Sequence, residues 1–308
     1  MSIVEQAVRR LEELRRSGIE PPAGTVRPPT ASQPAAQPPA PAPAQGEAAA
    51  PREKPHVASE SPTSGKASRT VNIDLGSLAA AGYLTPETPR ARIADEFRVV
   101  KRPLLSRIEA SANRPGSNLL MVSSSLPGEG KTFVSVNLAI SLAMELDKTV
   151  LLVDADVSRP SVLKRLGLPQ APGLLDLLTD PAVGVSDVLL RTNIPKLSLL
   201  PAGRQHGRAT ELLASEAMRR LLDELSNRYA DRILLFDSPP LLPSTESRVL
   251  ATRMGQVLLV VEADKTSQKT LEQALATLEQ CPDVSLLLNK ISRSEVGSYY
   301  GYYAPDEA

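Results

Sequence analysis

The stretch Ser123-Ser-Ser-Leu-Pro-Gly-Glu-Gly-Lys-Thr132 decides the fold of this chain. It follows the apolar run Leu119–Ser123 and precedes a helical pattern over residues 131–146, so a strand, a loop and a helix stand in order. Gly128 and Gly130 allow the loop to curl until its backbone N–H groups face an anion. The helix that follows presents the positive end of its dipole to the same point. The stretch therefore predicts a phosphate-binding loop.

This loop has the residues of a nucleotide site. Lys131 would reach the β and γ phosphates, and the Thr132 hydroxyl would hold Mg²⁺. The first glycine of the GxxxxGK[ST] pattern is replaced by Ser125, so the loop is a variant P-loop. A chance lysine in a Gly/Pro turn is the alternative, and the strand and helix on either side disfavour it. The predicted nucleotide-binding residues of the loop are Gly128, Glu129, Gly130, Lys131, Thr132 and Phe133.

Three acidic residues lie at or just after the ends of two further apolar runs. Asp154 ends the run 149–154 and Asp156 follows it, while Asp237 ends the run 233–237. Parallel strands gather their carboxyl ends at one edge of a sheet, beside the loop, so the three carboxylates are expected to converge on a Mg–nucleotide. Each acid alone would also fit a turn or a helix cap. The expected metal ligands are Thr132, Asp156 and Asp237, and the expected catalytic residues are Lys131, Asp154, Asp156 and Asp237.

Six short apolar runs alternate with helical patterns over residues 117–291. Each run is apolar throughout, as in a strand that is covered on both faces. The runs span residues 119–123, 149–154, 197–201, 233–237, 257–262 and 285–289, and the helical patterns lie near 131–146, 210–228, 245–254 and 266–280. This alternation predicts an α/β fold with a doubly wound, mostly parallel sheet of the P-loop NTPase type.

Composition divides the chain into four parts. Residues 1–18 have apolar side chains at helical spacing and predict an amphipathic helix, for which a protein partner is favoured over a membrane surface. Residues 19–70 are rich in Pro and Ala and predict a disordered linker. Residues 71–291 form the predicted P-loop domain, with a helix near 90–110, and residues 292–308 form a flexible tail.

Charge and cysteine content exclude several function classes. The chain has 308 residues, with 35 Lys or Arg against 35 Asp or Glu, and this balance argues against a general nucleic-acid binder. A single cysteine, Cys281, excludes an internal disulfide framework and any Cys cluster for a metal. The sequence contains no apolar run of about 18 residues and no signal-peptide core, so a cytoplasmic chain without a membrane span is expected.

Tyrosines gather in the tail. Four of the six tyrosines are Tyr299, Tyr300, Tyr302 and Tyr303. Small residues around them make the segment flexible enough to enter another molecule's active site. A tyrosine hydroxyl has a pKa near 10, so a carboxylate that takes its proton would assist phosphoryl transfer. About nine residues separate the last predicted strand from Tyr299, roughly 30 Å when extended, which favours autophosphorylation in trans.

The loop SSxxPGEGKT, the strand ending in DAD and the strand ending in DSPP resemble those of the bacterial tyrosine kinases, P-loop autokinases that control capsule and exopolysaccharide export. The resemblance covers about residues 90–303. Residues 1–17 and the stretch DEFRVVKRPLL (95–105) are similar to the subgroup of exosortase-linked exopolysaccharide clusters. In that subgroup the kinase is a separate chain, and a membrane polysaccharide chain-length protein is its partner. The resemblance implies ATP and Mg²⁺ as cofactors, a homo-oligomer that could form a ring, and recruitment to the inner face of the cell membrane.

The resemblance also implies roles for single residues. Lys131 and Thr132 match the family's phosphate- and Mg²⁺-binding pair. Asp154 and Asp156 match its second acidic motif, in which one carboxylate acts as base on the acceptor hydroxyl. Asp237 matches the Walker B acid, and Asn289 stands where relatives of this fold read adenine.

Two departures from the family pattern affect these expectations. Ser158 occupies the arginine position of the family's DxDxR motif, and Arg159 follows it. The family's oligomerisation motif ExxRxxR is replaced by Asp95-x-x-Arg98-x-x-Lys101. A solvated helix face explains these three residues as well as an oligomer contact does.

Three other functions share the fold. A switch ATPase of the partition type usually has an additional lysine early in its P-loop, and Ser124-Ser125-Leu126 offers none. A reductase of the nitrogenase iron-protein kind needs two cysteines per chain. A non-catalytic nucleotide-binding scaffold is suggested only by Ser158, and the intact Lys131 and acidic residues disfavour it.

Overall fold

The computed structural model describes residues 69–228 and 232–291. The strands are β1 (Arg69–Val71), β2 (Leu119–Ser124), β3 (Thr149–Asp154), β4 (Leu190–Thr192), β5 (Leu197–Leu200), β6 (Arg232–Asp237), β7 (Gln256–Glu262) and β8 (Val284–Asn289). The helices are α2 (Leu75–Ala80), α3 (Arg92–Ala110), α4 (Lys131–Ala143), α5 (Val162–Arg165), α6 (Leu174–Thr179), α7 (Val185–Val188), α8 (Ala209–Leu213), α9 (Glu216–Arg228), α10 (Thr245–Ala251) and α11 (Gln268–Ala276). The predicted helix 1–18, most of the linker 19–70 and the tail 292–308 lie outside the described residues.

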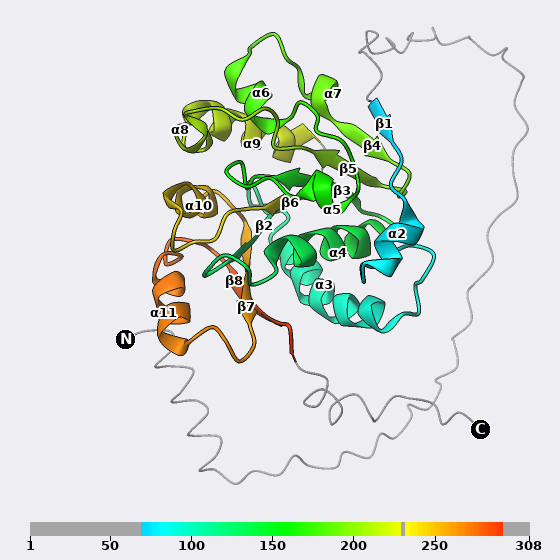
Figure 1. Ribbon diagram of the computed structural model, residues 1–308. Helices are drawn as coiled ribbons and strands as arrows, with labels where there is room; N and C mark the ends of the chain where they lie inside the picture. Colours follow the sequence, from blue (N-terminus) through cyan, green and yellow to red (C-terminus); the bar gives the residue numbers. More distant parts are fainter. Residues whose placement is uncertain (1–68, 229–231, 292–308) are drawn as a thin grey trace, which may run out of the picture. The chain divides into compact units, whose positions relative to one another are not determined.

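The described strands form one sheet in the order β1-β4-β5-β3-β6-β2-β7-β8 (Figure 1). The pair β4–β5 is antiparallel and the other pairs are parallel. The prediction of a doubly wound, mostly parallel α/β sheet is confirmed, and each of the six predicted strands agrees with the structure to within one residue at either end. Because β2 lies between β6 and β7, the loop that follows β2 emerges inside the sheet and not at an edge.

Alternate side chains of each central strand enter two cores on opposite faces of the sheet. Val150 and Leu152 of β3 lie in the core that α2, α3 and α4 cover. Leu151 and Val153 lie in the other core, which α6, α9, α10 and α11 cover. A parallel strand that is buried on both faces is apolar throughout, which explains the continuous apolar runs in the sequence.

Helix α4, which begins at the P-loop, is enclosed on nearly all sides. Eleven of its thirteen residues are buried, because the sheet covers one side of the helix and α3 packs on another (Figure 1). The segment before α3 also contacts it: the Leu84 N–H donates to Asn137 Oδ1 at 2.7 Å, and the rings of Tyr83 and Phe133 have centroids 5.0 Å apart. The start of α4 is therefore held from several directions.

Three local predictions are wrong. Strand β1 begins at Arg69, inside the segment predicted as a linker, and it pairs with β4, which the apolar runs did not reveal. Val71, Ile73 and Leu75 alternate in the sequence as in a strand, but Leu75 begins helix α2. The single helix expected over 210–228 is two helices, because the Ser215 hydroxyl donates to the Leu212 carbonyl and accepts from the Met218 N–H at the break.

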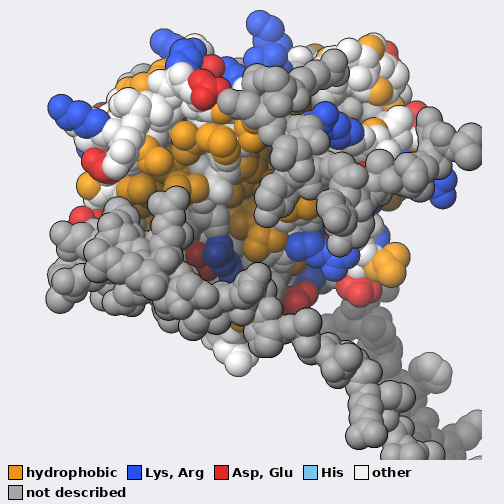
Figure 2. All heavy atoms as spheres, turned by 90° about the horizontal axis from the view of Figure 1, so that it is seen from below, with side chains coloured by type: hydrophobic (Ala, Val, Ile, Leu, Met, Phe, Trp, Pro, Cys, Tyr) orange, Lys and Arg blue, Asp and Glu red, His pale blue; other side chains and the backbone are white. Residues whose placement is uncertain are grey.

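Among the described strands, β8 lies at one edge of the sheet. Leu286 and Leu288 are exposed by 54% and 55%, although both lie on the strand, and Ile291 just after it is exposed by 41%. Figure 2 shows a face of the molecule on which hydrophobic side chains gather between Lys and Arg side chains. An edge strand with apolar side chains in solvent is unusual for an isolated chain, because it can pair with other chains.

The candidate oligomerisation residues of α3 do not share one surface. Asp95 and Arg98 form an ion pair within the helix, and both side chains are about half exposed. Lys101 is buried: its ammonium donates to the Ser141 carbonyl at 2.7 Å and pairs with Glu145 at 2.7 Å. This ammonium holds the pKa of Glu145 below its usual value. Lys101 therefore ties α3 to the end of α4, and only Asp95 and Arg98 of the three face solvent.

The buried Lys101 and the exposed Arg98 are expected to contribute differently to the stability of the fold. Lys101→Met should lower the free energy of unfolding by about 2 kcal/mol, because the Ser141 carbonyl and the Glu145 carboxylate lose their donor. Arg98→Met should change it by less than about 0.5 kcal/mol, because its ion pair is exposed. Urea denaturation of the two variants measures both values. Equal losses would contradict the structural role of Lys101.

Candidate nucleotide site

The predicted P-loop lies between β2 and α4. Gly128 and Gly130 have φ of 92° and 98°, in the left-handed region that favours glycine, and Gly130 is the N-cap of α4. A Cβ atom at Gly130 would lie 2.2 Å from the Asn289 amide nitrogen. Both glycines are therefore required by the backbone, as the sequence predicts, and the loop opens onto the amino end of a long helix.

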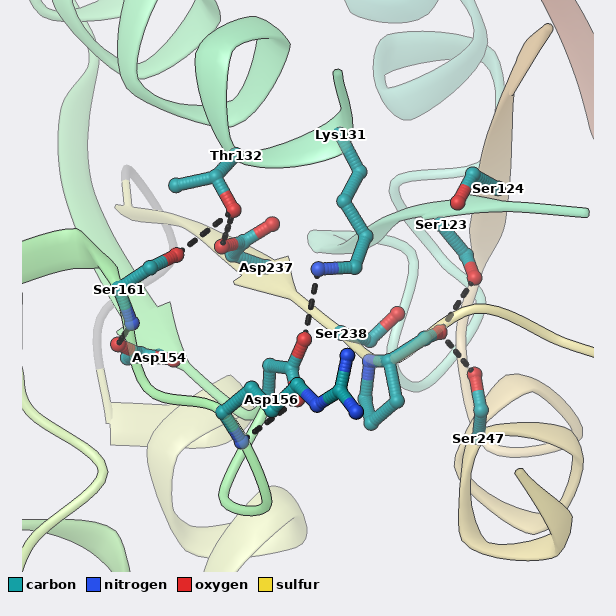
Figure 3. A network of polar contacts seen from close by, with 12 residues as sticks. Ser123, Ser124, Lys131, Thr132, Asp154, Asp156, Ser161, Asp237, Ser238 and Ser247 are labelled. Atoms are coloured by element: carbon teal, nitrogen blue, oxygen red, sulfur yellow. Dashed lines mark hydrogen bonds and ion pairs between the residues drawn. The ribbon is translucent and has the colours of Figure 1, made fainter. Parts of the chain in front are cut away.

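Lys131 and Asp156 point toward one another across the site (Figure 3). The Lys131 ammonium lies 2.6 Å from Asp156 Oδ2, and both side chains are largely buried. Asp156 Oδ1 accepts the backbone N–H of Arg159 at 3.2 Å, which fixes the carboxylate. A phosphate group that entered the loop would compete with Asp156 for the Lys131 ammonium.

Thr132 and Asp237 make the second contact of the site. Thr132 Oγ1 donates to Asp237 Oδ2 at 2.7 Å and lies 3.0 Å from the Ser161 hydroxyl (Figure 3). The Ser135 hydroxyl, one helical turn later, donates to the other oxygen of Asp237 at 3.0 Å. Burial raises the pKa of Asp237, and the Lys131 ammonium opposes that rise. Asp237 is thus an acid without solvent exposure, held beside the first turn of α4.

The hydroxyl of Thr132 and the carboxylate of Asp237 fit a magnesium ion. Both are hard oxygen donors, which Mg²⁺ prefers, and they lie within hydrogen-bond distance of one another next to the phosphate loop. Asp156 supplies a further carboxylate from the end of β3, paired with Lys131. The donor set that the sequence predicts for the metal is therefore brought together.

Asp154 is a second buried acid of the site with a raised pKa. It lies beside Asp237 in the sheet register, and its Oδ2 accepts the N–H groups of Ser161 and Val162, both at 3.0 Å. Its Oδ1 is buried and has no hydrogen-bond partner among the described residues. Burial, reinforced by the neighbouring Asp237, raises the pKa of Asp154 to about 7. A carboxylate with this pKa can accept or release a proton near neutral pH.

Two of the predicted nucleotide-binding residues, Phe133 and Asn289, contact other parts of the protein with their side chains. The Phe133 ring packs against Tyr83 and Phe97, so its side chain faces the core and only its backbone N–H could serve a phosphate. Asn289, at the end of β8, donates from Nδ2 to the Glu129 carbonyl at 2.9 Å. Asn289 therefore lies against the P-loop, and its expected contact with adenine stays a prediction.

Among the residues at the variant positions, Arg159 contacts an acid, because its backbone N–H donates to Asp156 Oδ1 at 3.2 Å. The Ser125 side chain, in place of the first glycine, is fully buried, and its hydroxyl has no partner among the described residues. Ser158 and Arg159 are both exposed in the loop after Asp156. The predicted phosphorylation sites Tyr299, Tyr300, Tyr302 and Tyr303 lie outside the described residues.

Several polar contacts of the site were missed by the sequence analysis. Ser135 could have been found, because it stands one helical turn from Lys131. Ser161, Thr266 and Lys290 could not, because they contact loop residues 29, 137 and 162 positions away in the chain. No periodicity or motif connects residues at such separations.

No helix in the described part of the chain has the length and apolar character needed to cross a membrane.

Comparisons with known proteins show which families and chains this protein is similar to. The family described as "AAA domain" matches residues 118–290, more than half of the chain. The tyrosine-protein kinase ptk of Acinetobacter johnsonii is 34% identical over 64% of this chain and 26% of its own length. The tyrosine-protein kinase YwqD of Bacillus subtilis is 28% identical over 74% of this chain and 93% of its own length. The crystal structure of the VpsO kinase domain is 29% identical with a TM-score of 0.51, over 66% of this chain and 100% of that one.

The relatives differ in how much of their own length this chain matches. The chain spans about a quarter of the length of the first curated relatives it matches. The part that the family model matches contains strands β2 to β8, the P-loop and the three strand-end acids. The chain therefore belongs to the AAA-domain family, and it is similar to bacterial tyrosine-protein kinases.

Proposed function

We propose that this chain is an ATP-dependent protein-tyrosine autokinase that phosphorylates Tyr299, Tyr300, Tyr302 and Tyr303 of a neighbouring copy. The observation that carries the proposal is the convergence of Lys131 and Thr132 with Asp156 and Asp237, beside the buried Asp154. The similarity to bacterial tyrosine kinases and the tyrosine-rich tail support the choice of acceptor.

Each group of site residues has its own role in the proposed reaction. The P-loop N–H groups and Lys131 bind the phosphates of ATP, and Asn289 lies where the adenine would be read. Thr132, Asp156 and Asp237 would hold Mg²⁺, which when bound neutralises charge on the β and γ phosphates. In the transfer, a bond forms between the tyrosine oxygen and the γ-phosphorus, the bond from that phosphorus to the bridging oxygen breaks, and ADP leaves. The Asp154 carboxylate accepts the proton of the tyrosine hydroxyl.

The partners follow from the family resemblance. A homo-oligomer, which could be a ring, would place one copy's tail at the next copy's site. A membrane polysaccharide chain-length protein would recruit the chain to the inner face of the membrane from the cytoplasm, where the kinase would regulate exopolysaccharide export. Phosphates on the tail repel one another, so assembly should loosen as they accumulate.

Mass spectrometry of the purified chain after incubation with Mg–ATP tests the proposal. Phosphate is expected on Tyr299–Tyr303 in the wild type and absent in Lys131→Ala, because this lysine contacts the transferred phosphoryl group. A mixture of Lys131→Ala with an active chain truncated after Ser298 should phosphorylate the Lys131→Ala tail, which establishes transfer in trans.

Two other outcomes would overturn the autokinase. Free phosphate release with an unmodified tail would assign the chain to the partition-type switch ATPases. Neither signal, in the presence of demonstrated ATP binding and of the membrane partner, would leave a non-catalytic nucleotide-binding scaffold.

A further inference from the structure

We propose that Lys290 is a positioning residue of the nucleotide site, which holds the P-loop open for phosphate from the end of the last strand. The inference rests on the proposed function only in that the loop binds ATP. Lys290 follows β8 directly, and its ammonium donates to the Gly128 carbonyl at 2.7 Å. With Asn289, which donates to the neighbouring Glu129 carbonyl at 2.9 Å, it supplies two donors to successive P-loop carbonyls.

Those two carbonyls must turn away from the ligand. A P-loop binds phosphate through backbone N–H groups that face inward, so the carbonyl oxygens of the same peptides have to face outward. An outward carbonyl is held in place when it finds a donor there. The donors from Asn289 and Lys290 therefore favour the one loop conformation in which the N–H groups converge.

Glu129 reinforces the same conformation from within the loop. Glu129 is buried, with only 2% of the residue exposed. Its Oε2 accepts the Leu126 N–H at 2.8 Å. Its Oε1 accepts the hydroxyl of Thr266, which lies between β7 and α11. The loop is thus braced by Thr266 after β7, by Asn289 at the end of β8 and by Lys290 after it.

The backbone of Lys290 shows that its position is imposed by its surroundings. Its φ is 60°, in the left-handed region that side chains other than glycine rarely adopt. Such a conformation persists only where neighbouring contacts fix it, and it occurs preferentially at functional sites. Glu262, at the end of β7, pairs with the Lys290 ammonium at 3.1 Å and keeps it beside Gly128.

The chain contains a matched control for this role. Lys265 pairs with the same carboxylate, Glu262, at 3.3 Å, and its side chain is 73% exposed. The structure shows no contact between Lys265 and the P-loop. Lys265→Met therefore removes the same charge from the same partner without removing a donor from Gly128.

Equilibrium titration of the full chain with a fluorescent ADP analogue and Mg²⁺ tests the proposal. Lys290→Met should raise the Kd for ADP about tenfold, the effect of losing one charged hydrogen bond that orders the loop. Lys265→Met should change the Kd by less than about twofold. Lys290→Arg, which restores a cationic donor, should recover most of the affinity, and the melting temperature without nucleotide should be the same in all three variants.

The readout separates this inference from the proposed kinase activity. ADP binding needs no phosphoryl transfer, so a chain that binds ADP but does not phosphorylate its tail would still test Lys290. Equal weakening by Lys290→Met and Lys265→Met would overturn the inference, because Glu262 and not the P-loop contact would then be responsible. An unchanged Kd in Lys290→Met, or a wild type that binds no ADP, would overturn it as well.

Discussion

Asp154→Asn is expected to lower the rate of tyrosine phosphorylation by about 10²–10⁴-fold while it raises the melting temperature at pH 8 by roughly 5–10 °C. The loss of rate follows from the loss of a proton acceptor at the site, since an amide cannot take the tyrosine proton. The gain in stability follows from the surroundings of Asp154. Its charged form is buried beside Asp237, with one oxygen that accepts no hydrogen bond from the described residues.

The sign of the stability effect depends on pH. The pKa of Asp154 is about 7 in the folded chain, above the value of 3.8 for an unperturbed aspartate. A raised pKa means that the folded state binds this proton more tightly, so its stabilising contribution is complete below pH 4 and is lost as the pH rises toward 7. Above pH 7 the buried charge costs on the order of a few kcal/mol. The neutral asparagine removes that cost, and its oxygen can still accept from Ser161 and Val162.

Thermal denaturation at pH 5 and pH 8, together with phosphorylation rates, measures both effects. The difference in melting temperature between Asp154→Asn and the wild type should be larger at pH 8 than at pH 5. Asp264→Asn is the control, because Asp264 is an exposed acid in the turn after β7 and its φ of 56° suits asparagine. A variant of Asp154 that phosphorylates normally, or that melts earlier at pH 8, would contradict the assignment of Asp154 as a buried base.

The fold could be predicted from the sequence because its central strands are buried on both faces. A run such as Thr149–Asp154 has one environment along its whole length, so its apolar character alone defines the strand and its end. The edges of the sheet lack this signal. Strand β4 (Leu190–Thr192) has three residues, of which Arg191 is exposed, and its place is set by pairing with β1 and β5.

The nucleotide site also has residues that the sequence predicts and properties that it does not. Lys131, Thr132, Asp154, Asp156 and Asp237 could be predicted because each stands at the end of a strand or the start of a helix, where topology fixes its place. The pKa of Asp154 could not be predicted, because it depends on burial and on the Asp237 carboxylate of the neighbouring strand. The contacts of Lys290 and Thr266 could not be predicted either, since a lysine and a threonine in a turn are normally solvated.

Gly130→Ala is expected to reduce nucleotide affinity by more than about 10²-fold, and Gly128→Ala by much less. Both glycines have φ in the left-handed region, at 98° and 92°, so alanine introduces backbone strain of about 1–2 kcal/mol at either position. Their surroundings differ. A Cβ atom at Gly130 would lie 2.2 Å from Asn289 Nδ2, whereas a Cβ atom at Gly128 would meet no atom within 4 Å.

The clash at Gly130 acts on binding through one specific contact. Asn289 would have to move, and its hydrogen bond to the Glu129 carbonyl would break in the same movement. The P-loop would then lose a donor that keeps its N–H groups facing inward, in addition to the strain. Gly128→Ala keeps that contact, so it isolates the contribution of strain alone.

Calorimetric titration of ADP with Mg²⁺ into both variants compares the two positions directly. The ratio of the Kd values for Gly130→Ala and Gly128→Ala should exceed about tenfold, because strain is shared and only the clash differs. A third variant, Gly130→Ala with Asn289→Ala, removes the atom that the new methyl group meets. If the clash is the cause, the double variant binds ADP more tightly than Gly130→Ala alone, although it lacks the asparagine. Weaker binding by the double variant would show instead that Asn289 contributes to affinity mainly by direct contact with the nucleotide.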